Sequence, residues 1–254
     1  MDQVAEKPKK PKKKQKRRGR PVGIGGQAAI VDAVQVYQIA DALEATGTRG
    51  VGYRDRCIWL LGLSLGFRCG EVLSLRVQDV WSAALNRPLE EITIDASRTK
   101  TRKSRTVNLG ADGRIVLIEW MMRRPGRPDP GAPLFCSYGC PMTPLSYCSF
   151  LSRLEGIRVG LGMPRLSTHS MRRTGANLLR LSGADLEVIR VFLGHSTIEQ
   201  TRAYLGVSRE ERIAAVERRA VLLQDARLEA SRARPEPVPV LPPCDPLPSP
   251  DWSI

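Results

Sequence analysis

Histidine is nearly absent from this chain, which has two among its 254 residues. Cysteine is sparse as well, with six residues at irregular spacings, so the sequence lacks the framework of a small disulfide-rich protein. Cys136, Cys140 and Cys148 lie close together, but no histidine lies near them to complete a zinc site. We therefore expect no metal site, and a protein that works in a reducing, intracellular compartment.

Long apolar runs are also missing. No run approaches the roughly 20 apolar residues that a membrane-spanning helix needs. The lysine-rich N-terminus is not followed by the apolar segment of a secretory signal. Both absences favour a cytoplasmic protein without a membrane partner. The length allows one large domain or two small ones with a sizeable core.

Positive charge is in excess. The chain has 40 Lys and Arg against 26 Asp and Glu, a formal net charge of +14. Residues 1–20 hold ten basic and two acidic residues, a balance of +8, and the rest of the chain supplies the other +6. Positive charge in both parts favours a polyanionic partner, most simply nucleic acid. The lysine run alone is equally consistent with a solubilising or localisation tail.

Composition divides the chain into three parts. Residues 1–27 form a basic tail and residues 231–254 a proline-rich tail, and we expect disorder in both because neither can bury enough apolar surface. Residues 28–230 are predicted to be one mainly α domain. Apolar periodicity predicts helices at 28–45, 53–65, 69–77, 114–123, 144–161, 178–193, 197–205 and 210–230. Alternation at 89–96 and 105–109 predicts a β-hairpin or a small three-stranded sheet.

Both histidines fall within one pattern. His169 and Arg172 are three apart, His195 follows a Leu-Gly pair, and Tyr204 comes nine residues later. Cleavage of a phosphodiester by a protein nucleophile needs an attacking hydroxyl, cations on the non-bridging oxygens and an acid for the leaving oxygen. Arginine donates two parallel hydrogen bonds to a phosphate. A tyrosine phenolate leaves more readily than an alkoxide, so the covalent step is reversible and favours rejoining over hydrolysis.

Four segments in order resemble the tyrosine recombinases, the phage-integrase family. They are 66–75 around Arg68, the basic segment 100–109, the His169-x-x-Arg172 pair, and 193–204 with His195 and Tyr204. Any one of these residues alone is more often structural. Together the segments supply five elements in the family's order and spacing, namely an arginine, a lysine, a His-x-x-Arg pair, a histidine and a tyrosine, and this combination is a specific signal. The match covers about residues 28–222. It implies a mainly α catalytic domain with a small antiparallel β-sheet.

The resemblance also implies a role for each matching residue. Tyr204 is the nucleophile that forms a 3′-phosphotyrosyl bond. Arg68 and Arg172 clamp the scissile phosphate. His169 assists proton transfer, and His195 hydrogen-bonds the phosphate or positions its neighbours. No metal, nucleotide or other cofactor is implied.

The acid and the supporting residues are less sharply defined. Lys100 matches the family's catalytic lysine and would protonate the leaving 5′-oxygen, but it lies in a basic run in which Lys103 is the alternative acid. Lys103 and Arg105 are otherwise expected to contact DNA. Glu71, one turn past Arg68, is expected to support that arginine.

Three features depart from the family. Most members carry a separate helical DNA-binding domain before the catalytic one, whereas about 27 tail residues precede the first helix predicted here. Within that tail, 17–21 resembles an AT-hook, whose Arg18 and Arg20 would reach the floor of the minor groove in A·T-rich DNA. A generic basic tail is at least as consistent with the sequence. Arg173 replaces a frequent second histidine and Asn108 a frequent proline, and neither is expected to contact phosphate.

The resulting hypothesis is a site-specific recombinase of a plasmid or mobile element. It would act on double-stranded DNA as a homotetramer around two sites, in the cytoplasm and associated with the nucleoid. One alternative is a DNA-relaxing enzyme similar to type IB topoisomerases, which would act as a monomer without site specificity. The other is a non-catalytic DNA-binding regulator on the same fold, against which the complete catalytic set argues.

Overall fold

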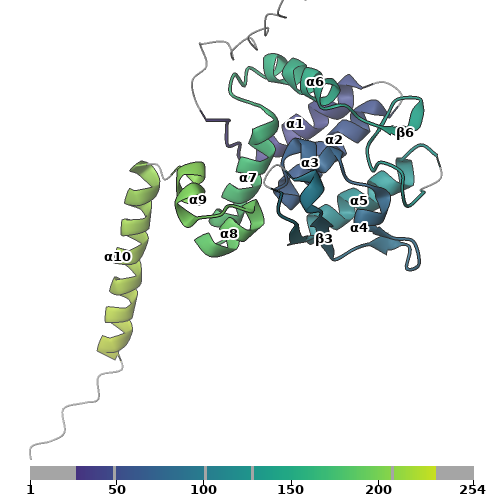
Figure 1. The fold of residues 1–254 in the computed structure, drawn as a ribbon. Helices are drawn as coiled ribbons and strands as arrows, with labels where there is room; N and C mark the ends of the chain where they lie inside the picture. Colours follow the sequence, from purple (N-terminus) through teal and green to yellow (C-terminus); the bar gives the residue numbers. More distant parts are fainter. Residues whose placement is uncertain (1–26, 48–49, 100–101, 127–128, 207–208, 233–254) are drawn as a thin grey trace, which may run out of the picture. The chain divides into compact units, whose positions relative to one another are not determined.

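The computed structural model describes residues 27–47, 50–99, 102–126, 129–206 and 209–232. Two compact units make up the chain, Met1–Leu205 and Gly206–Ile254. The first unit contains helices α1–α9 and small hairpins, and the second contains α10 (Arg209–Arg232) (Figure 1). No helix in these ranges is long and apolar enough to cross a membrane. Lys100, Arg18 and Arg20 lie outside the described residues, as does most of both predicted tails.

Helix α2 (Val51–Leu65) is the centre of the first unit. It contacts α1 (Ala33–Thr46), α5 (Ala111–Arg123) and α7 (Thr168–Leu181). Ile58, Trp59 and Leu61 are fully buried, because this apolar stretch is surrounded by packed helices. The indole nitrogen of Trp59 donates to the carbonyl of Val36 at 3.0 Å, so its one polar atom is satisfied inside the core.

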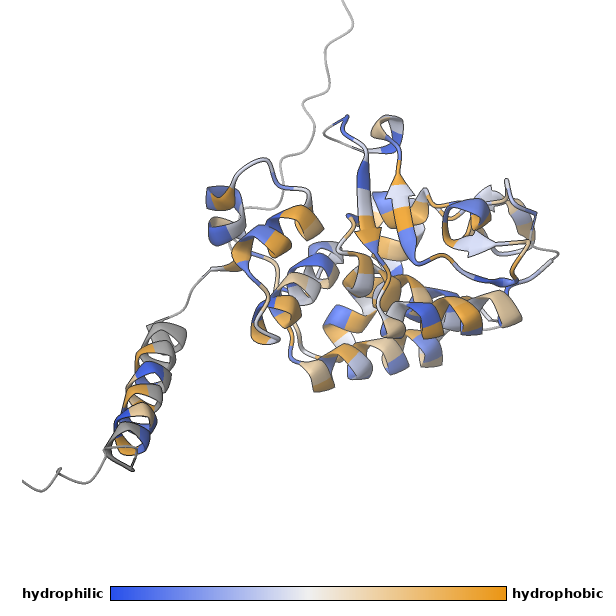
Figure 2. Ribbon diagram, turned by 90° about the horizontal axis from the view of Figure 1, so that it is seen from below, coloured by the Kyte–Doolittle hydropathy of each residue, from blue (hydrophilic) through white to orange (hydrophobic). Residues whose placement is uncertain are grey.

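Hydrophobic and hydrophilic residues alternate in bands along the helices of the first unit, as expected for helices that bury one face (Figure 2). Shorter elements complete the first unit. They are α3 (Cys69–Leu73), α4 (Val77–Val80), α6 (Tyr147–Gly160), the β1–β2 hairpin (Trp81–Ser82 and Arg87–Pro88) and the β5–β6 hairpin (Cys136–Ser137 and Cys140–Pro144).

The predicted central hairpin is confirmed as β3 (Glu91–Ile94) paired antiparallel with β4 (Arg105–Asn108). In the part of the chain that the structure describes, every sheet has two strands, so no third strand joins this hairpin. Side chains alternate between the two faces of a strand, so Arg105 shares the inward face of Val107. The hairpin thereby directs Arg105 toward the interior.

One helix prediction was wrong in extent. The segment 178–193 is not continuous but splits into the end of α7 and a separate α8 (Leu186–Leu193). Asp185 starts α8 by accepting a hydrogen bond from the Glu187 backbone at 2.7 Å. Helix α7 begins ten residues earlier than predicted, at Thr168, where the Ser167 hydroxyl accepts from the His169 backbone. The His-x-x-Arg pair therefore lies in the first turns of α7.

Other helices start later than periodicity alone predicts, because capping side chains fix their first turns. Helix α1 begins at Ala33, where Asp32 and Gln35 form a reciprocal capping box. Helix α6 begins after Ser146, and Pro144 ends β6 rather than opening a helix. The predicted helix at 69–77 is interrupted after α3. The short helix α9 (Ile198–Leu205) and the long α10 agree with the sequence prediction.

Helices α7, α8 and α9 share a second, smaller apolar cluster. Its buried members are Ala176, Ile189, Leu193 and Leu205, and Tyr204 packs against them. Helix α9 thus rests on α7 and α8. This arrangement places the C-terminal end of α9, and Tyr204 with it, beside the first turns of α7.

Candidate active site

Arg68 is held at the start of α3 by Glu71. The Arg68 backbone nitrogen donates to one carboxylate oxygen of Glu71 at 2.8 Å, and its guanidinium donates to the other at 2.9 Å. Glu71 is 4% exposed, so a single buried carboxylate both caps the helix and orients the guanidinium. Gly66, just before, has φ 58°, and a Cβ there would lie 2.3 Å from the Phe192 ring. The glycine of this motif is therefore required for packing.

Arg172 is buried behind this corner, and its guanidinium joins two distant turns. It donates to the carbonyl of Gly66 at 2.6 Å and to the carbonyl of Leu193. Arg105 donates to the same Leu193 carbonyl at 2.6 Å and to Glu71 at 3.3 Å. Burial, and then the positive charge of neighbouring guanidinia, lowers the pKa of both Arg172 and Arg105 to about 10. Both still carry their charge at neutral pH.

The site therefore concentrates positive charge. Arg68, Arg105 and Arg172 surround one carboxylate, that of Glu71, which leaves an excess of two positive charges. Such an excess away from water is unfavourable until an anion enters. The side-chain nitrogen Nε of Arg105 is buried and has no hydrogen-bond partner among the described residues. The charge pattern fits a phosphate group, which accepts hydrogen bonds from several guanidinium nitrogens at once.

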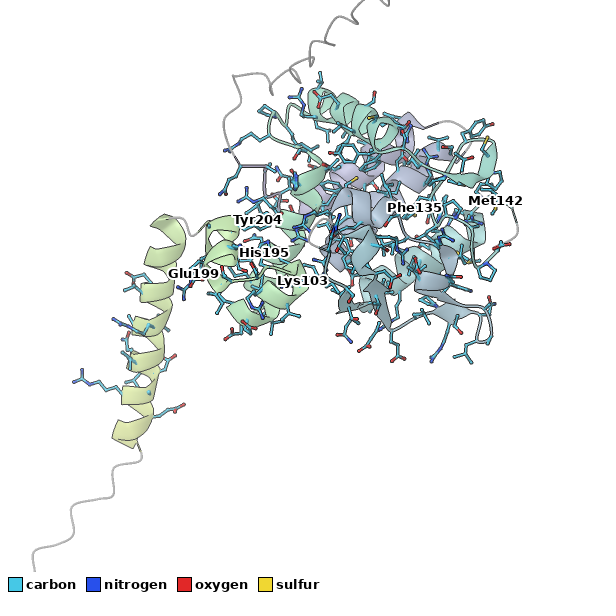
Figure 3. The ribbon with its side chains drawn as sticks, in the orientation of Figure 1. Lys103, Phe135, Met142, His195, Glu199 and Tyr204 are labelled. Carbon is cyan, nitrogen blue, oxygen red and sulfur yellow. The ribbon has the colours of Figure 1, made fainter. Side chains whose placement is uncertain are left out.

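His195 follows α8 at a tight turn. Gly194 ends α8 with φ 60°, and a Cβ there would lie 2.7 Å from the Arg105 side chain. The His195 Nδ1 lies 3.1 Å from the Thr201 hydroxyl on α9. Its ring stands edge-on to Tyr204, with 5.2 Å between the ring centroids. Figure 3 shows His195 and Tyr204 on the same side of the unit as Lys103, away from Phe135 and Met142.

His195 is neutral at physiological pH. Burial first, and then the charges of Arg172, Arg68 and Arg105, lower its pKa from 6.5 to about 4. A neutral imidazole can accept a hydrogen bond or a proton at one ring nitrogen and donate from the other.

This pKa yields a direct prediction. Because the chain has two histidines, NMR of the imidazole Cε1–H groups gives two signals, and the signal that is missing in a His195→Gln variant belongs to His195. We expect the His195 signal to stay constant from pH 8 to 6, with a midpoint near 4. Since the folded state binds this proton less tightly than the unfolded state, the free energy of unfolding should fall as pH drops from 6.5 toward 4. A midpoint at or above 6.5 would refute this electrostatic description.

Tyr204 occupies the last turn of α9. Its hydroxyl is buried and has no well-formed hydrogen bond among the described residues. Burial raises the pKa of Tyr204, and the positive charges of Arg172 and Arg173 oppose that rise. The Arg172 guanidinium carbon lies 5.9 Å from the centre of the Tyr204 ring. Since the hydroxyl is protonated at neutral pH, it needs a base or a nearby cation to become a nucleophile.

Two cavities meet at Arg68. One, of about 320 Å³, is lined by Arg68, Glu71 and His169, and His169 is exposed there. The other, of about 560 Å³, is lined by Arg68, Glu71, Lys103 and His195. The structure thus brings together every predicted catalytic residue that it describes. These residues are Arg68, His169, Arg172, His195 and Tyr204, with Glu71, Lys103 and Arg105 around them.

Two arginines have positions that the sequence prediction did not anticipate. Arg105 was predicted to contact DNA, but its guanidinium donates hydrogen bonds to Glu71 and to the Leu193 carbonyl. Its alternation with Val107 is the sequence signal that indicates an inward direction. Arg173 was given no role in the site by the sequence analysis, yet it donates to the backbone carbonyl of Tyr204 at 3.1 Å. No local pattern indicates that contact, because 31 residues separate the partners.

Residues 30–211 match the phage integrase family. The chain is 27% identical over 171 residues to transposase A from transposon Tn554 of Staphylococcus aureus, covering 66% of this chain and 45% of that protein. It is 29% identical over 182 residues to tyrosine recombinase XerC of Syntrophus aciditrophicus, covering 66% and 53%. The crystal structure of the XerH site-specific recombinase bound to palindromic difH substrate, a post-cleavage complex, has the same fold. Its TM-score is 0.59 at 22% identity, over 76% of this chain and 53% of that one. The chain spans about half the length of the curated relatives it matches.

Proposed function

The chain belongs to the phage integrase family, and from this premise we propose that it is a site-specific DNA recombinase. It cleaves and rejoins DNA strands through a 3′-phosphotyrosyl intermediate. The observation that carries the proposal is the position of Tyr204, whose ring lies against His195 and beside the buried Arg172. A tyrosine hydroxyl next to excess guanidinium charge is suited to attack a phosphodiester.

We propose the following chemical step, in which the roles of His169 and Lys100 rest on the resemblance to the family. The Tyr204 oxygen attacks phosphorus and loses its proton, with His169 assisting the transfer. A bond forms between Tyr204 and phosphorus, and the bond between phosphorus and the 5′-oxygen breaks. The leaving oxygen takes a proton from Lys100. One phosphodiester is exchanged for another, so the attack of a 5′-hydroxyl reverses the step without an external energy source.

The guanidinium groups stabilise the charge that develops on the non-bridging oxygens. Arg68 and Arg172 are preorganised for this role because Glu71 and the Gly66 carbonyl already fix them. Neutral His195 adds no further repulsion to the cluster and can hydrogen-bond the phosphate. Arg105 holds Glu71 and the α8 turn in place.

Double-stranded DNA is the proposed substrate and partner. The net charge of +14 supports a polyanion, and the XerH structure named above contains a DNA substrate. Four copies around two sites are proposed, because an exchange of two duplexes needs four strand cleavages. The similarity to a transposon-encoded transposase supports a mobile-element origin. We propose that the protein works in the cytoplasm, associated with the nucleoid.

An unbiased cleavage selection tests the function and identifies the target site in the same experiment. The protein is incubated with a pool of nicked duplexes that have a random central sequence. The fragment beyond the nick diffuses away after cleavage, so covalent adducts accumulate and survive SDS. Sequencing of the trapped DNA should recover one recurrent motif. Efficient relaxation of supercoiled plasmid, with no motif and no two-site recombination, would instead favour a topoisomerase-like enzyme.

The basic tail gives a second, separable prediction. Deletion of residues 1–26, which keeps Gln27, should weaken DNA binding and reduce its salt dependence. Each phosphate contact that is lost makes the negative slope of log K against log salt shallower by about 0.9. Fluorescence anisotropy at several salt concentrations measures both quantities. An unchanged slope would show that the tail does not bind DNA.

The AT-hook hypothesis makes a sharper claim about the same tail. Arg18→Ala combined with Arg20→Ala should reduce affinity for sites with A·T-rich flanks more than for sites with G·C-rich flanks. Equal losses on both would remove the AT-hook and leave a generic basic tail. Neither outcome affects the catalytic assignment.

A further inference from the structure

We propose that Arg173 is a positioning residue that holds the Tyr204-bearing end of α9, acting jointly with Gln27 in the segment before α1. The proposal rests on the function proposed above. It also makes residues 27–31 a working part of the catalytic unit, although they precede the first helix.

The contacts form a closed ring of hydrogen bonds. Arg173 donates to the carbonyl of Tyr204 at 3.1 Å, to the carbonyl of Ala28, and to the side-chain oxygen of Gln27 at 2.6 Å. The Gln27 amide nitrogen donates to the carbonyl of Ala203 at 2.9 Å. Arg173 and Gln27 therefore bind two successive carbonyls of α9 and also bind each other. The ring joins α7, α9 and the N-terminal segment.

These carbonyls are the ones that α9 cannot satisfy itself. Helix α9 ends at Leu205, and the last four carbonyls of a helix have no intrahelical donor. A cation at a helix C-terminus also interacts favourably with the helix dipole. The guanidinium supplies charge and several donors in a rigid fork, which a lysine cannot reproduce. Arg173 is 7% exposed, so water competes little for these bonds.

Among the described residues, α9 is otherwise held by apolar packing of Leu205 and Tyr204 on α7 and α8 and by few polar contacts. The helix has eight residues, and Thr201 and Leu205 are its buried members. Helices of this length are marginal without tertiary contacts. The Thr201 hydroxyl contacts His195 in the N-terminal half of α9, and Arg173 and Gln27 bind the carbonyls of the other half, where Tyr204 lies.

The N-terminal segment is itself docked on α7, which carries Arg173, and on the turn before that helix. The Val31 backbone donates to the Thr174 hydroxyl at 3.1 Å, and the Ala29 backbone donates to the Arg165 carbonyl at 2.9 Å. These two bonds fix the position of the segment that carries Gln27 beside Arg173. Arg173 also lies 5.6 Å from the centre of the Tyr204 ring. It acts on the nucleophile through the backbone and the ring.

The test compares Arg173→Gln, Arg173→Lys, Gln27→Ala and the double variant Arg173→Gln with Gln27→Ala against a matched control, Arg180→Gln. Arg180 lies on the same helix and donates to the side-chain oxygen of Asn177 at 2.7 Å. Hydrogen exchange of the 198–205 amides is measured without DNA. Single-turnover adduct formation and DNA affinity are measured on a duplex recovered by the cleavage selection. Melting temperatures identify any variant that fails to fold.

We expect the Arg173 variants to slow adduct formation by up to about 10²-fold at unchanged DNA affinity, because a small displacement of a nucleophile is enough for such a loss. Exchange in α9 should rise by about tenfold while exchange in α2 stays constant. Arg180→Gln should change neither quantity. Gln27→Ala should have a smaller effect that disappears in the Arg173→Gln background, since both residues belong to one ring.

Three results would overturn the inference. The first is cleavage by Arg173→Lys at the wild-type rate, which would show that positive charge alone is sufficient. The second is full additivity of the effects of the Arg173 and Gln27 substitutions. The third is unchanged hydrogen exchange in α9. If Arg173→Gln unfolds, the adduct rates and hydrogen exchange of Arg173→Lys and Gln27→Ala test the inference instead. If the wild-type protein forms no adduct, the proposed recombinase function fails, whereas hydrogen exchange still reports on the ring.

Discussion

Tyr204→Phe abolishes covalent attachment to DNA and leaves DNA affinity nearly unchanged. The substitution removes one oxygen, whose buried position has no well-formed hydrogen bond to lose among the described residues. Affinity depends mainly on phosphate contacts, to which one phenol contributes little. The rate of adduct formation should fall by at least about 10⁴-fold, since loss of a nucleophile removes the covalent route altogether. An SDS gel with end-labelled nicked duplex measures the adduct.

Tyr147 provides the matched control for this experiment. Its hydroxyl lies 3.0 Å from that of Thr168, and its side chain lines the same cavity as Arg68 and His169. It is therefore the other tyrosine close to the site in the described part of the chain. Tyr147→Phe should retain adduct formation within a few-fold of the wild type. An adduct that persists in Tyr204→Phe but is lost in Tyr147→Phe would transfer the role to Tyr147.

Lys100→Ala slows cleavage far more than it weakens binding, and Lys103→Ala does the reverse. A general acid contributes about 10²–10⁴ in rate, whereas loss of one phosphate contact changes mainly affinity and its salt dependence. Lys103 is exposed and lines the cavity that contains Arg68 and His195, so its position suits a phosphate contact. Single-turnover rates and anisotropy on the same duplex separate the two effects.

A substrate that needs no acid identifies the proton donor. A sulfur in place of the bridging 5′-oxygen leaves without protonation. It should restore cleavage to Lys100→Ala and give no comparable gain to Lys103→Ala. Rescue of Lys103→Ala alone would assign the acid to Lys103, the alternative that the basic run leaves open.

The motif residues were predicted from their resemblance to the family, and short-range geometry accounts for some of the contacts between them. Glu71 lies three residues past Arg68, one helical turn, so the capping contact follows from spacing. His169 and Arg172 likewise share one helix. The hairpin was predictable from alternation, and the helix at 53–65 from apolar periodicity.

The rest of the site depends on contacts between distant parts of the chain. Arg172 bonds to Gly66 across 106 residues, and Arg173 bonds to Ala28 across 145. Neither separation leaves a periodic signal. Helix boundaries were misplaced where a capping side chain overrides apolar periodicity, as at Asp32 and Asp185. The roles of Lys100 and of the basic tail stay predictions, since both lie outside the described residues.

The central claim is that Tyr204 becomes linked to a DNA 3′-phosphate. Adducts trapped on the selected duplex are digested with nuclease and trypsin and analysed by tandem mass spectrometry. Trypsin releases Tyr204 within the peptide Ala203–Arg209. The account predicts a nucleotide remnant on Tyr204, bound through its 3′-phosphate, and a free 5′-hydroxyl on the released strand. A remnant on any other residue, or a 5′-phosphate attachment, would contradict it.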